Sequence, residues 1–451
     1  MKDLNEITIL ELVIMLRNKT LSAKELVQHY ISRIQRLDQG ENGVNSILEI
    51  NPEAVEIAEQ LDKKGFKGAG MLAGIPILLK DNINTADFMH TSAGSLALAE
   101  SYAPWDADLV KMLREKGAIL LGKTNMTEFA NYMTQGMPSG YSSRGGQVKS
   151  PYISKENPSG SSSGSAVAAA ANFCVASIGT DTCNSIIAPG LKNGIVGFRP
   201  SIGALSRKGI IPISRTLDTA GPMARTVTDT AILYSELTNT QLTTSSIIDF
   251  SGITIGINEW GKDVMTEEEA IKMDNIIKEL ESAGADLKKI EIPATNNVMP
   301  LMKYELKFAM NRYLSELPVS FPIHTLKDII HFNLEHKDTA LRYGQSYLTD
   351  AEDNTSGTLC ETEYLEIIKD REEEIKKIRY QLKNIDFCIM LIGNNILHYT
   401  GLPSITVPCG LYKNGMPFGI IITAKTDSEL LKYAGAVEMI VGQRVEPQFI
   451  I

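Results

Sequence analysis

Apolar residues recur at three- and four-residue steps in several parts of the chain, which is the spacing of helices that pack one face against a core. From residue 7 to about residue 37 this spacing predicts two helices, and Ser22 with Glu25 forms a capping-box pattern at the start of the second. A third helix is expected over residues 52–64. The other predicted helices cover residues 108–117, 166–172, 227–237, 267–283 and 427–441 and most of 299–383.

Short apolar runs between these helices predict strands, and one of them, residues 72–79, leads directly into Lys80. The glycine and proline of the segment 221–226 favour a turn, and the long polar segment 135–160 is typical of a functional loop. The alternation of strands with helices predicts a layered α/β fold, and no internal repeat is visible. The other predicted strands cover residues 118–123, 174–177, 195–200, 253–257, 387–392, 404–408 and 418–423.

The size and charge of the chain narrow the function classes. Its 451 residues suggest two or three domains, although a large α/β fold can form one, and the polar residues 238–246 mark one candidate boundary. The net charge of −10 is spread along the chain, which argues against nucleic acid or an anionic membrane as a partner. We see neither an apolar run of membrane-spanning length nor a secretory signal in the opening residues.

Cysteine and histidine usage gives no indication of a cross-linked or metal-binding protein. The five cysteines are odd in number and lack CxxC spacing, and the six histidines lack HExxH spacing. We therefore expect no disulfide framework, no metal and no cofactor, and a reducing cytoplasm as the compartment. The cysteines are Cys174, Cys183, Cys360, Cys388 and Cys409.

Two segments rich in glycine, serine and threonine are the most informative part of the sequence. Residues 160–165 stand directly before the alanine-rich run 166–171, and residues 179–185 follow shortly after it. Glycine lets a backbone approach a ligand closely, and a helix N-terminus offers N–H groups to developing negative charge. A flexible linker is the alternative that serine and glycine usually suggest, but the dense apolar run favours a packed loop. The pattern predicts an acyl-transfer site.

Lys80 has two interpretations that the sequence alone leaves open. A lysine that ends a buried run can extend its amine to the surface. Alternatively, burial lowers the pKa of the amine, so that the neutral form can act as a base.

The segment 160–164 also matches the G-x-S-x-G nucleophile elbow, with Ser162 at its centre. That motif requires a buried strand before the turn and a catalytic histidine later in the chain. The residues before the segment are polar, so they do not form a buried strand. The residues around the later histidines do not mark any of them as catalytic, so we do not favour the elbow. These histidines are His324, His331, His336 and His398.

Three separated motifs, in this order, resemble those of the amidase signature family. They are residues 78–82 around Lys80, residues 160–165, and residues 179–186. The segments 122–125, 218–225 and 401–408 resemble further recurrent segments of that family. The likeness covers most of the chain, and only about residues 238–383 differ from a general family pattern.

The resemblance implies a single large α/β/α domain over residues 1–451, with a mixed, twisted β-sheet covered by helices. Its core motifs would lie in 72–230 and 384–445, and a variable, largely helical region at about 299–383 would face the substrate. It also implies a Ser-cisSer-Lys triad. Carried over to this sequence, Ser185 is the nucleophile, Ser161 is the bridging serine after a cis peptide bond, and Lys80 is the base.

The remaining site predictions concern the oxyanion hole and the substrate. Backbone N–H groups of Thr182, Cys183, Asn184 and Ser185 would face the oxyanion. The family usually has two glycines in place of Cys183 and Asn184, and often an arginine in place of Ile187. Cys183 has no evident histidine partner, so we interpret it as a loop residue rather than a rival nucleophile. The residues expected to contact the substrate are Ala130, Asn131, Ser162 and Asp181.

The resemblance implies an amidase of the peptide-amidase-like branch, which hydrolyses a carboxylic amide or a peptide C-terminal amide to the acid and ammonia through an acyl-enzyme. One alternative is a glutamine-hydrolysing amidotransferase subunit of the glutaminyl-tRNA type. Another is a catalytically inactive homologue that acts as a binding protein. The expected partner is a small-molecule or peptide amide, with no nucleic acid and no membrane, and a homodimer is one option for the assembly.

Overall fold

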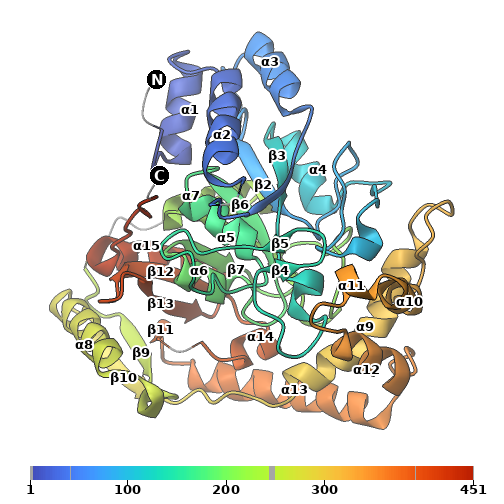
Figure 1. The fold of residues 1–451 in the computed structure, drawn as a ribbon. Helices are drawn as coiled ribbons and strands as arrows, with labels where there is room; N and C mark the ends of the chain where they lie inside the picture. The colour runs from blue at the N-terminus through green and yellow to red at the C-terminus, as the bar shows by residue number, and fades with distance from the viewer. Residues whose placement is uncertain (1–3, 41, 243–248, 392, 450–451) are drawn as a thin grey trace.

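A mixed sheet of eleven strands runs through the molecule (Figure 1). The computed structural model describes residues 4–40, 42–242, 249–391 and 393–449. The strand order is β1-β3-β2-β6-β8-β7-β12-β13-β11-β9-β10. The pairs β2 with β3, β2 with β6, β9 with β11 and β9 with β10 are parallel, and the other pairs are antiparallel.

The strands of this sheet are short and mostly buried. Two further strands, β4 (Tyr141–Ser142) and β5 (Gly146–Gln147), form a separate hairpin within the long polar loop. The sheet strands are β1 (Ile47–Ile50), β2 (Pro76–Lys80), β3 (Ile119–Thr124), β6 (Ala176–Asp181), β7 (Val196–Arg199), β8 (Thr219–Ala224), β9 (Thr254–Asn258), β10 (Asp286–Ile290), β11 (Phe387–Met390), β12 (Ser404–Leu411) and β13 (Pro417–Ala424).

The helices begin and end close to where the sequence pattern places them. Ser22 and Glu25 form the predicted capping box at the start of α2, and the third predicted helix ends at Lys64. The helices are α1 (Ile9–Arg17), α2 (Ala23–Leu37), α3 (Ala54–Lys64), α4 (Asp108–Glu115), α5 (Ser163–Ala170), α6 (Ile187–Lys192), α7 (Val227–Thr238), α8 (Glu267–Ser282), α9 (Val298–Ser315), α10 (Leu326–Glu335), α11 (Lys337–Ala340), α12 (Ser346–Asn354), α13 (Thr362–Gln381), α14 (Ile396–Thr400) and α15 (Asp427–Val441), with 3-10 turns η1 (Leu96–Leu98), η2 (Glu128–Asn131) and η3 (Lys262–Val264).

Two predictions about strands were wrong. The predicted turn at 221–226 is largely strand β8, which lies in the middle of the sheet between β6 and β7. Strand β6 continues to Asp181, so the predicted loop 179–185 is a shorter turn that starts at Thr182. Strands β1 and β10 were not predicted. The candidate boundary at 238–246 falls partly on residues 243–246, which lie outside the described residues.

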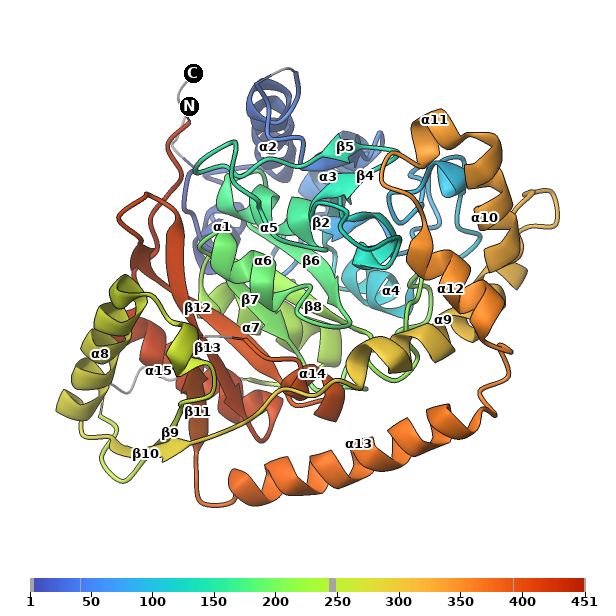
Figure 2. The same ribbon diagram turned by 60° about the horizontal axis from the view of Figure 1, so that its bottom comes forward.

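Helices cover both faces of the sheet (Figures 1 and 2). α5 and α6 contact each other and pack over the central strands, and α7 and α15 contact each other against the same strands. The predicted α/β fold class is therefore confirmed. Helices α9 to α12 gather at one end of the molecule, and the long helix α13 runs along the side that comes forward in Figure 2.

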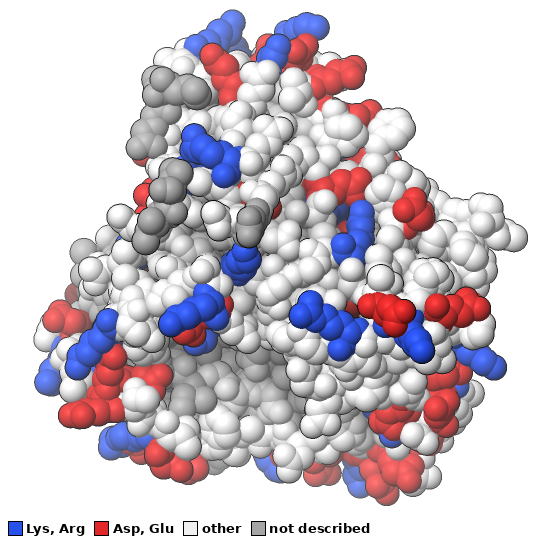
Figure 3. Space-filling view, viewed as in Figure 1, with Lys and Arg blue, Asp and Glu red and all other residues white. Residues whose placement is uncertain are grey.

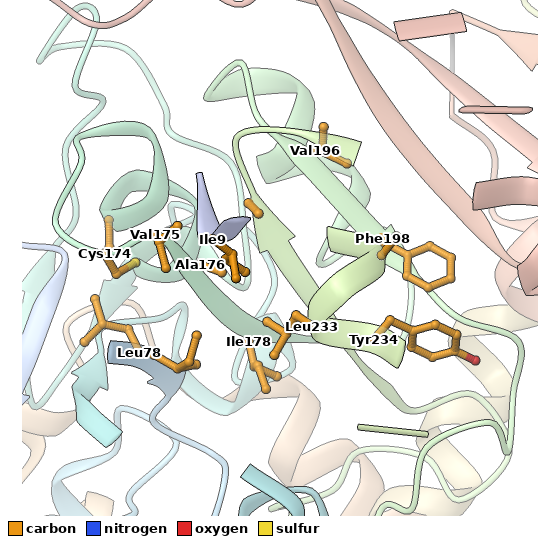
Figure 4. Packing of buried hydrophobic residues seen from close by; sticks show 14 of the residues in the cluster. Ile9, Leu78, Cys174, Val175, Ala176, Ile178, Val196, Phe198, Leu233 and Tyr234 are labelled. Carbon is orange, nitrogen blue, oxygen red and sulfur yellow. The ribbon is translucent and has the colours of Figure 1, made fainter. Parts of the chain in front are cut away.

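One part of the core lies between the central strands and helices such as α1 and α7 (Figure 4). Phe198 of β7 meets Tyr234 of α7 edge to face, with 5.0 Å between the ring centroids. Such rings remove a large apolar area from water, which is the main force that holds a helix to a sheet. On the other side of the sheet, every residue of α5 is buried. The loop before α5 is therefore held by a helix that cannot move without opening the core.

Within the described ranges, none of the helices combines the length and the apolar character needed to cross a membrane.

On the face shown in Figure 3, basic and acidic side chains are interspersed. The same face is hollowed in its lower half, near the position of α14 and β11 in Figure 1.

Candidate active site

Lys80 is the last residue of β2, and its side chain is completely buried. Its amine lies 2.7 Å from Ser161 Oγ and 3.0 Å from Ser162 Oγ. The amine also lies 2.8 Å from the hydroxyl and 3.1 Å from the carbonyl oxygen of Thr180 on β6. The alternative of a lysine that extends to the surface is therefore wrong.

Burial lowers the pKa of Lys80 to about 7, because an ammonium group loses its hydration inside the protein. The negative charges of Asp181 and Asp218 raise this pKa in part. At neutral pH a large share of the Lys80 amines is therefore uncharged. An uncharged amine holds a lone pair, which is the property required of a general base.

The loop that carries Ser161 is fixed from several sides. The Gly160–Ser161 peptide bond is cis, as the resemblance implies. The carbonyl oxygen of Ser161 accepts a hydrogen bond from the N–H of Thr127 at 3.1 Å. A Cβ atom at Gly160 would lie 2.4 Å from Thr127 Oγ1, so only glycine allows this close approach. The loop is packed, and the flexible-linker alternative is wrong.

The hydroxyl of Ser162 is fully engaged in holding this arrangement. It donates to the Thr180 carbonyl oxygen at 2.9 Å and accepts from the Thr180 N–H at 3.2 Å, beside its contact with Lys80. The side chain is completely buried. This geometry disfavours Ser162 as the nucleophile of an elbow. Its contact with a substrate stays a prediction.

Ser185 lies in the turn that connects β6 to α6 and is nearly buried. Its carbonyl oxygen accepts a hydrogen bond from the N–H of Ser162 at 3.1 Å. This bond joins the turn of Ser185 to the loop of Ser161, and Lys80 contacts that loop directly. The three residues predicted for the triad thus belong to one connected set of contacts, and their catalytic roles stay predictions.

Asp218 holds the first residue of this turn. Its Oδ1 accepts a hydrogen bond from the Thr182 hydroxyl at 2.6 Å, and its Oδ2 accepts from the N–H groups of Ile213 and Ser214 at 2.9 and 3.0 Å. Burial raises the pKa of Asp218 to about 6, and these hydrogen bonds oppose the rise. The side chain of Thr182 is therefore joined through Asp218 to the backbone at Ile213 and Ser214.

Asp181, at the end of β6, is buried and charged. Its Oδ2 accepts from the N–H of Ile186 at 2.7 Å, while Arg199 Nε and His398 Nδ1 lie 3.3 and 2.9 Å from its Oδ1. Burial by itself would raise its pKa, but the charges of His398 and Arg199 and the Ile186 bond lower it to about 2. Asp181 thus links the two ends of the turn. Its contact with a substrate stays a prediction.

The two residues that replace the usual glycines behave differently. Asn184 takes a φ of 68°, in the left-handed region that glycine favours and asparagine tolerates, whereas Cys183 is not among the residues with positive φ. Burial, followed by the charge of Asp181, raises the pKa of the Cys183 thiol to about 12. A thiol that keeps its proton is a poor nucleophile, so the geometry agrees with the interpretation of Cys183 as a loop residue.

The predicted substrate residues Ala130 and Asn131 come shortly after Thr127, which contacts the loop of Ser161. They belong to a short segment with positive φ, 51° and 73°, that follows Thr127 and its hydrogen bond to Ser161. Ala130 is half-buried and Asn131 is exposed. Thr127 thus joins the start of this segment to the loop of Ser161, and contact of Ala130 and Asn131 with a substrate stays a prediction.

Sequence reasoning missed four residues that shape the site: Thr180, Asp218, Arg199 and His398. Thr180 and Asp218 lie inside segments that carry the family resemblance, so that resemblance could have identified them as site residues. Arg199 is completely buried and His398 is 1% exposed. No local pattern marks His398, which reaches the turn only because α14 lies beside the end of β6 in the folded chain.

A sequence profile described as Amidase matches residues 25–431. The chain belongs to the amidase family. A solved structure, the native peptide amidase from Stenotrophomonas maltophilia, is 34% identical and superimposes with a TM-score of 0.90 over 99% of both chains. A probable amidase of Arabidopsis thaliana is 34% identical over 99% of this chain and 92% of its own length.

A third relative, from Coxiella burnetii, is named as one of the subunits of glutamyl-tRNA(Gln) amidotransferase and is 38% identical. That match covers 65% of this amidase and 62% of the relative. The match to the peptide amidase, at 34% identity over 99% of both chains, together with the family profile confirms the predicted family and branch. The protein is an enzyme that hydrolyses amide C–N bonds.

Proposed function

We propose that this amidase hydrolyses primary amides, with Ser185 as nucleophile, Ser161 as bridging serine and Lys80 as base. The substrate would be a small carboxylic amide or the C-terminal amide of a peptide, and the products the acid and ammonia. The observation that carries the proposal is the buried amine of Lys80, 2.7 Å from Ser161 Oγ. The similarity to a protein named peptide amidase, over 99% of both chains, favours peptide amides.

The contacts of Lys80 suit a neutral amine. Such an amine has two N–H groups and one lone pair. Ser162 Oγ can accept from one N–H at 3.0 Å, and Thr180 can accept from the other through its hydroxyl at 2.8 Å and its carbonyl oxygen at 3.1 Å. The lone pair is then directed to the hydroxyl of Ser161, which is the shortest of these contacts. Ser161 can therefore give its proton to Lys80 while it receives one from Ser185.

Acylation begins when Ser185 Oγ attacks the carbonyl carbon of the amide and its proton passes through Ser161 to Lys80. The carbonyl oxygen becomes an oxyanion that faces backbone N–H groups between Thr182 and Ser185. Loss of one such donor typically costs about 3 kcal/mol of transition-state stabilisation. The proton then returns through Ser161 to the nitrogen, the C–N bond breaks, and ammonia leaves.

Deacylation uses the same groups in reverse order. Water gives a proton through Ser161 to Lys80 and attacks the ester carbon of the acyl-enzyme. The tetrahedral intermediate collapses, the C–O bond to Ser185 breaks, and the proton returns to Ser185. The acid is released, and the enzyme regains its starting state.

A fluorophosphonate probe, which labels activated serines, tests this assignment. We expect wild type to be labelled, Ser185→Ala to remain unlabelled, and Ser162→Ala to retain labelling at a lower rate, because Ser162 supports Lys80. A panel from short aliphatic amides to peptide C-terminal amides then identifies the substrate class. If the folded wild type neither labels nor hydrolyses any amide, the proposal is wrong, and the alternative of an inactive binding protein is preferred.

The match to the amidotransferase relative favours a second candidate, a glutamine-hydrolysing subunit that acts in a complex. Affinity purification of the tagged chain from its own cells distinguishes the two candidates. A partner recovered in equal amount, together with glutamine hydrolysis that exceeds peptide-amide hydrolysis, would support the second candidate. Recovery of the chain by itself, with a preference for peptide amides, supports the proposal above.

A further inference from the structure

Asn184, directly before Ser185, occupies a conformation that few side chains adopt. Its φ of 68° is in the left-handed region, where an asparagine is tolerated but still costs free energy relative to glycine. The backbone N–H groups of this turn are the expected oxyanion donors. A residue that stabilises Asn184 in this conformation therefore also controls the direction of those donors.

His398 contacts Asn184 although 214 residues separate the two in the chain. The ring Nε2 lies 2.8 Å from Asn184 Oδ1, and Nδ1 accepts a hydrogen bond from the Asn184 backbone N–H at 3.4 Å and lies 2.9 Å from Asp181 Oδ1. The N–H of Asn184 is therefore directed at His398, which leaves those of Cys183 and Ser185 as the expected oxyanion donors next to it. One buried ring thus bridges the residue before the turn and the residue before Ser185.

The contact is a hydrogen bond in every protonation state of the ring. When Nε2 carries a proton, Nε2–H donates to the carboxamide oxygen of Asn184. When only Nδ1 is protonated, the side-chain carboxamide of Asn184 can rotate by 180°, and its NH₂ group then donates to Nε2. The pairing of His398 with Asn184 is therefore independent of which nitrogen holds the proton.

The ring and the carboxamide have little room to move. Arg199 donates to the backbone carbonyl oxygen of His398 at 3.4 Å and to that of Leu402 at 3.0 Å, which fixes the main chain of α14. A Cβ atom at Gly393 would lie 3.3 Å from Asn184 Oδ1, so the carboxamide is packed on that side as well. His398 is 1% exposed.

We propose that His398 is a positioning residue, which holds Asn184 in its left-handed conformation and so keeps the neighbouring N–H groups of Cys183 and Ser185 directed at the oxygen of a bound amide. This inference rests on the proposed function. It assigns to Asn184 a side-chain partner that a glycine at this position would not need. His398 itself does not touch the reacting atoms.

A double-mutant cycle with His398→Ala and Asn184→Gly tests the inference. We expect His398→Ala to lower kcat about tenfold to a hundredfold with little change in KM, the effect of a misdirected group. His398→Gln, whose amide can pair with Asn184, should recover most of the loss. In the Asn184→Gly background, His398→Ala should cost far less, because no carboxamide remains to be held.

The cycle separates this role from the other contact of His398. The contact with Asp181 and the hydrogen bond from the backbone N–H of residue 184 are lost in both backgrounds, so an equal loss of kcat in both would overturn the role of the carboxamide. A wild-type kcat in His398→Ala would also overturn it. Thermal unfolding of all four proteins shows whether a loss of activity is only a loss of folded enzyme.

The unfolding midpoints also report the contact without any turnover. A smaller effect of His398→Ala in the Asn184→Gly background supports the pairing, and additive effects contradict it, even if Asn184→Gly is inactive. If wild type hydrolyses no amide, the proposed function fails, while the unfolding cycle still decides whether His398 holds Asn184.

Discussion

The amine of Lys80 and the hydroxyl of Ser161 are 2.7 Å apart, although 81 residues separate them in the chain. Strands β2 and β6 are parallel neighbours, so Lys80 and Thr180 lie at the same edge of the sheet. The loop before α5 packs over that edge, because the whole helix behind it is buried. Strand pairing therefore creates the buried setting that lowers the pKa of Lys80.

Replacing Lys80 with methionine removes the amine while filling most of its volume. We expect kcat/KM for a primary amide to fall about 10²- to 10⁴-fold, the usual contribution of a general base. Steady-state kinetics above pH 7 measures the change, and circular dichroism confirms that the variant is folded. Near-wild-type turnover would show that Lys80 is not the base.

Lys123 offers a matched control for this variant. It is also completely buried, and its amine donates to the carbonyl oxygen of Ile83 at 2.7 Å and to the Thr91 hydroxyl at 2.8 Å. Lys123→Met should lower the thermal midpoint, because two buried acceptors lose their donor. The folded enzyme should keep a kcat/KM close to that of wild type.

The pH dependence of activity should follow the titration of Lys80. Its pKa is lowered to about 7, so the neutral amine, which is the active form if Lys80 is the base, becomes more populated as the pH rises through that value. We therefore expect kcat/KM to rise about tenfold per pH unit below pH 7 and to level off above it. A profile without this acidic limb would contradict the base assignment.

The position of that limb can be moved by a nearby charge. The carboxylate of Asp218 raises the pKa of Lys80, so Asp218→Asn should lower this pKa and shift the acidic limb to lower pH. Because Asp218 also accepts a hydrogen bond from Thr182, kcat is expected to fall as well. The direction of the shift, measured on the folded variant, is the deciding result.

Arg199→Met should destabilise the protein strongly. Arg199 and Asp181 are both completely buried, and removing Arg199 leaves the buried charge of Asp181 with only its contacts to Ile186 and His398 among the described residues. Such losses amount to about 3–5 kcal/mol in the free energy of unfolding. Urea unfolding measures this loss. As a control, Lys24→Met breaks the exposed pair with Glu59 and should change the free energy of unfolding little. Equal effects of the two variants would contradict this view of the buried pair.

Gly164→Ala should be destabilising even though alanine is the better helix former. A Cβ atom there would lie 2.2 Å from the carbonyl oxygen of Asn125 and 2.4 Å from that of Ser46, and neither backbone atom can move easily. We expect a loss of about 1–3 kcal/mol or more in unfolding free energy. In Gly70→Ala the nearest atoms would be 3.7 Å away, so a similar loss there would contradict the explanation.

Elements defined by local patterns were the most predictable part of the fold. The capping box at Ser22 and the bounds of α15 (Asp427–Val441) follow from residues a few positions apart, which interact within the same helix. Strand β8 was mistaken for a turn because it contains Gly221 and Pro222. In the sheet, a Cβ at residue 221 would lie 2.0 Å from the carbonyl oxygen of Phe198, so close packing requires glycine inside a strand.

The sequence by itself determined the family, the layered α/β fold and the candidate triad of Lys80, Ser161 and Ser185, because these depend on residue types in a fixed order. Only the tertiary structure decided that Lys80 is buried and that His398 meets Asn184 across 214 residues. The pKa of an amine and the partner of a carboxamide depend on atoms within a few ångströms. In this protein those atoms come from strands and helices far apart in the chain.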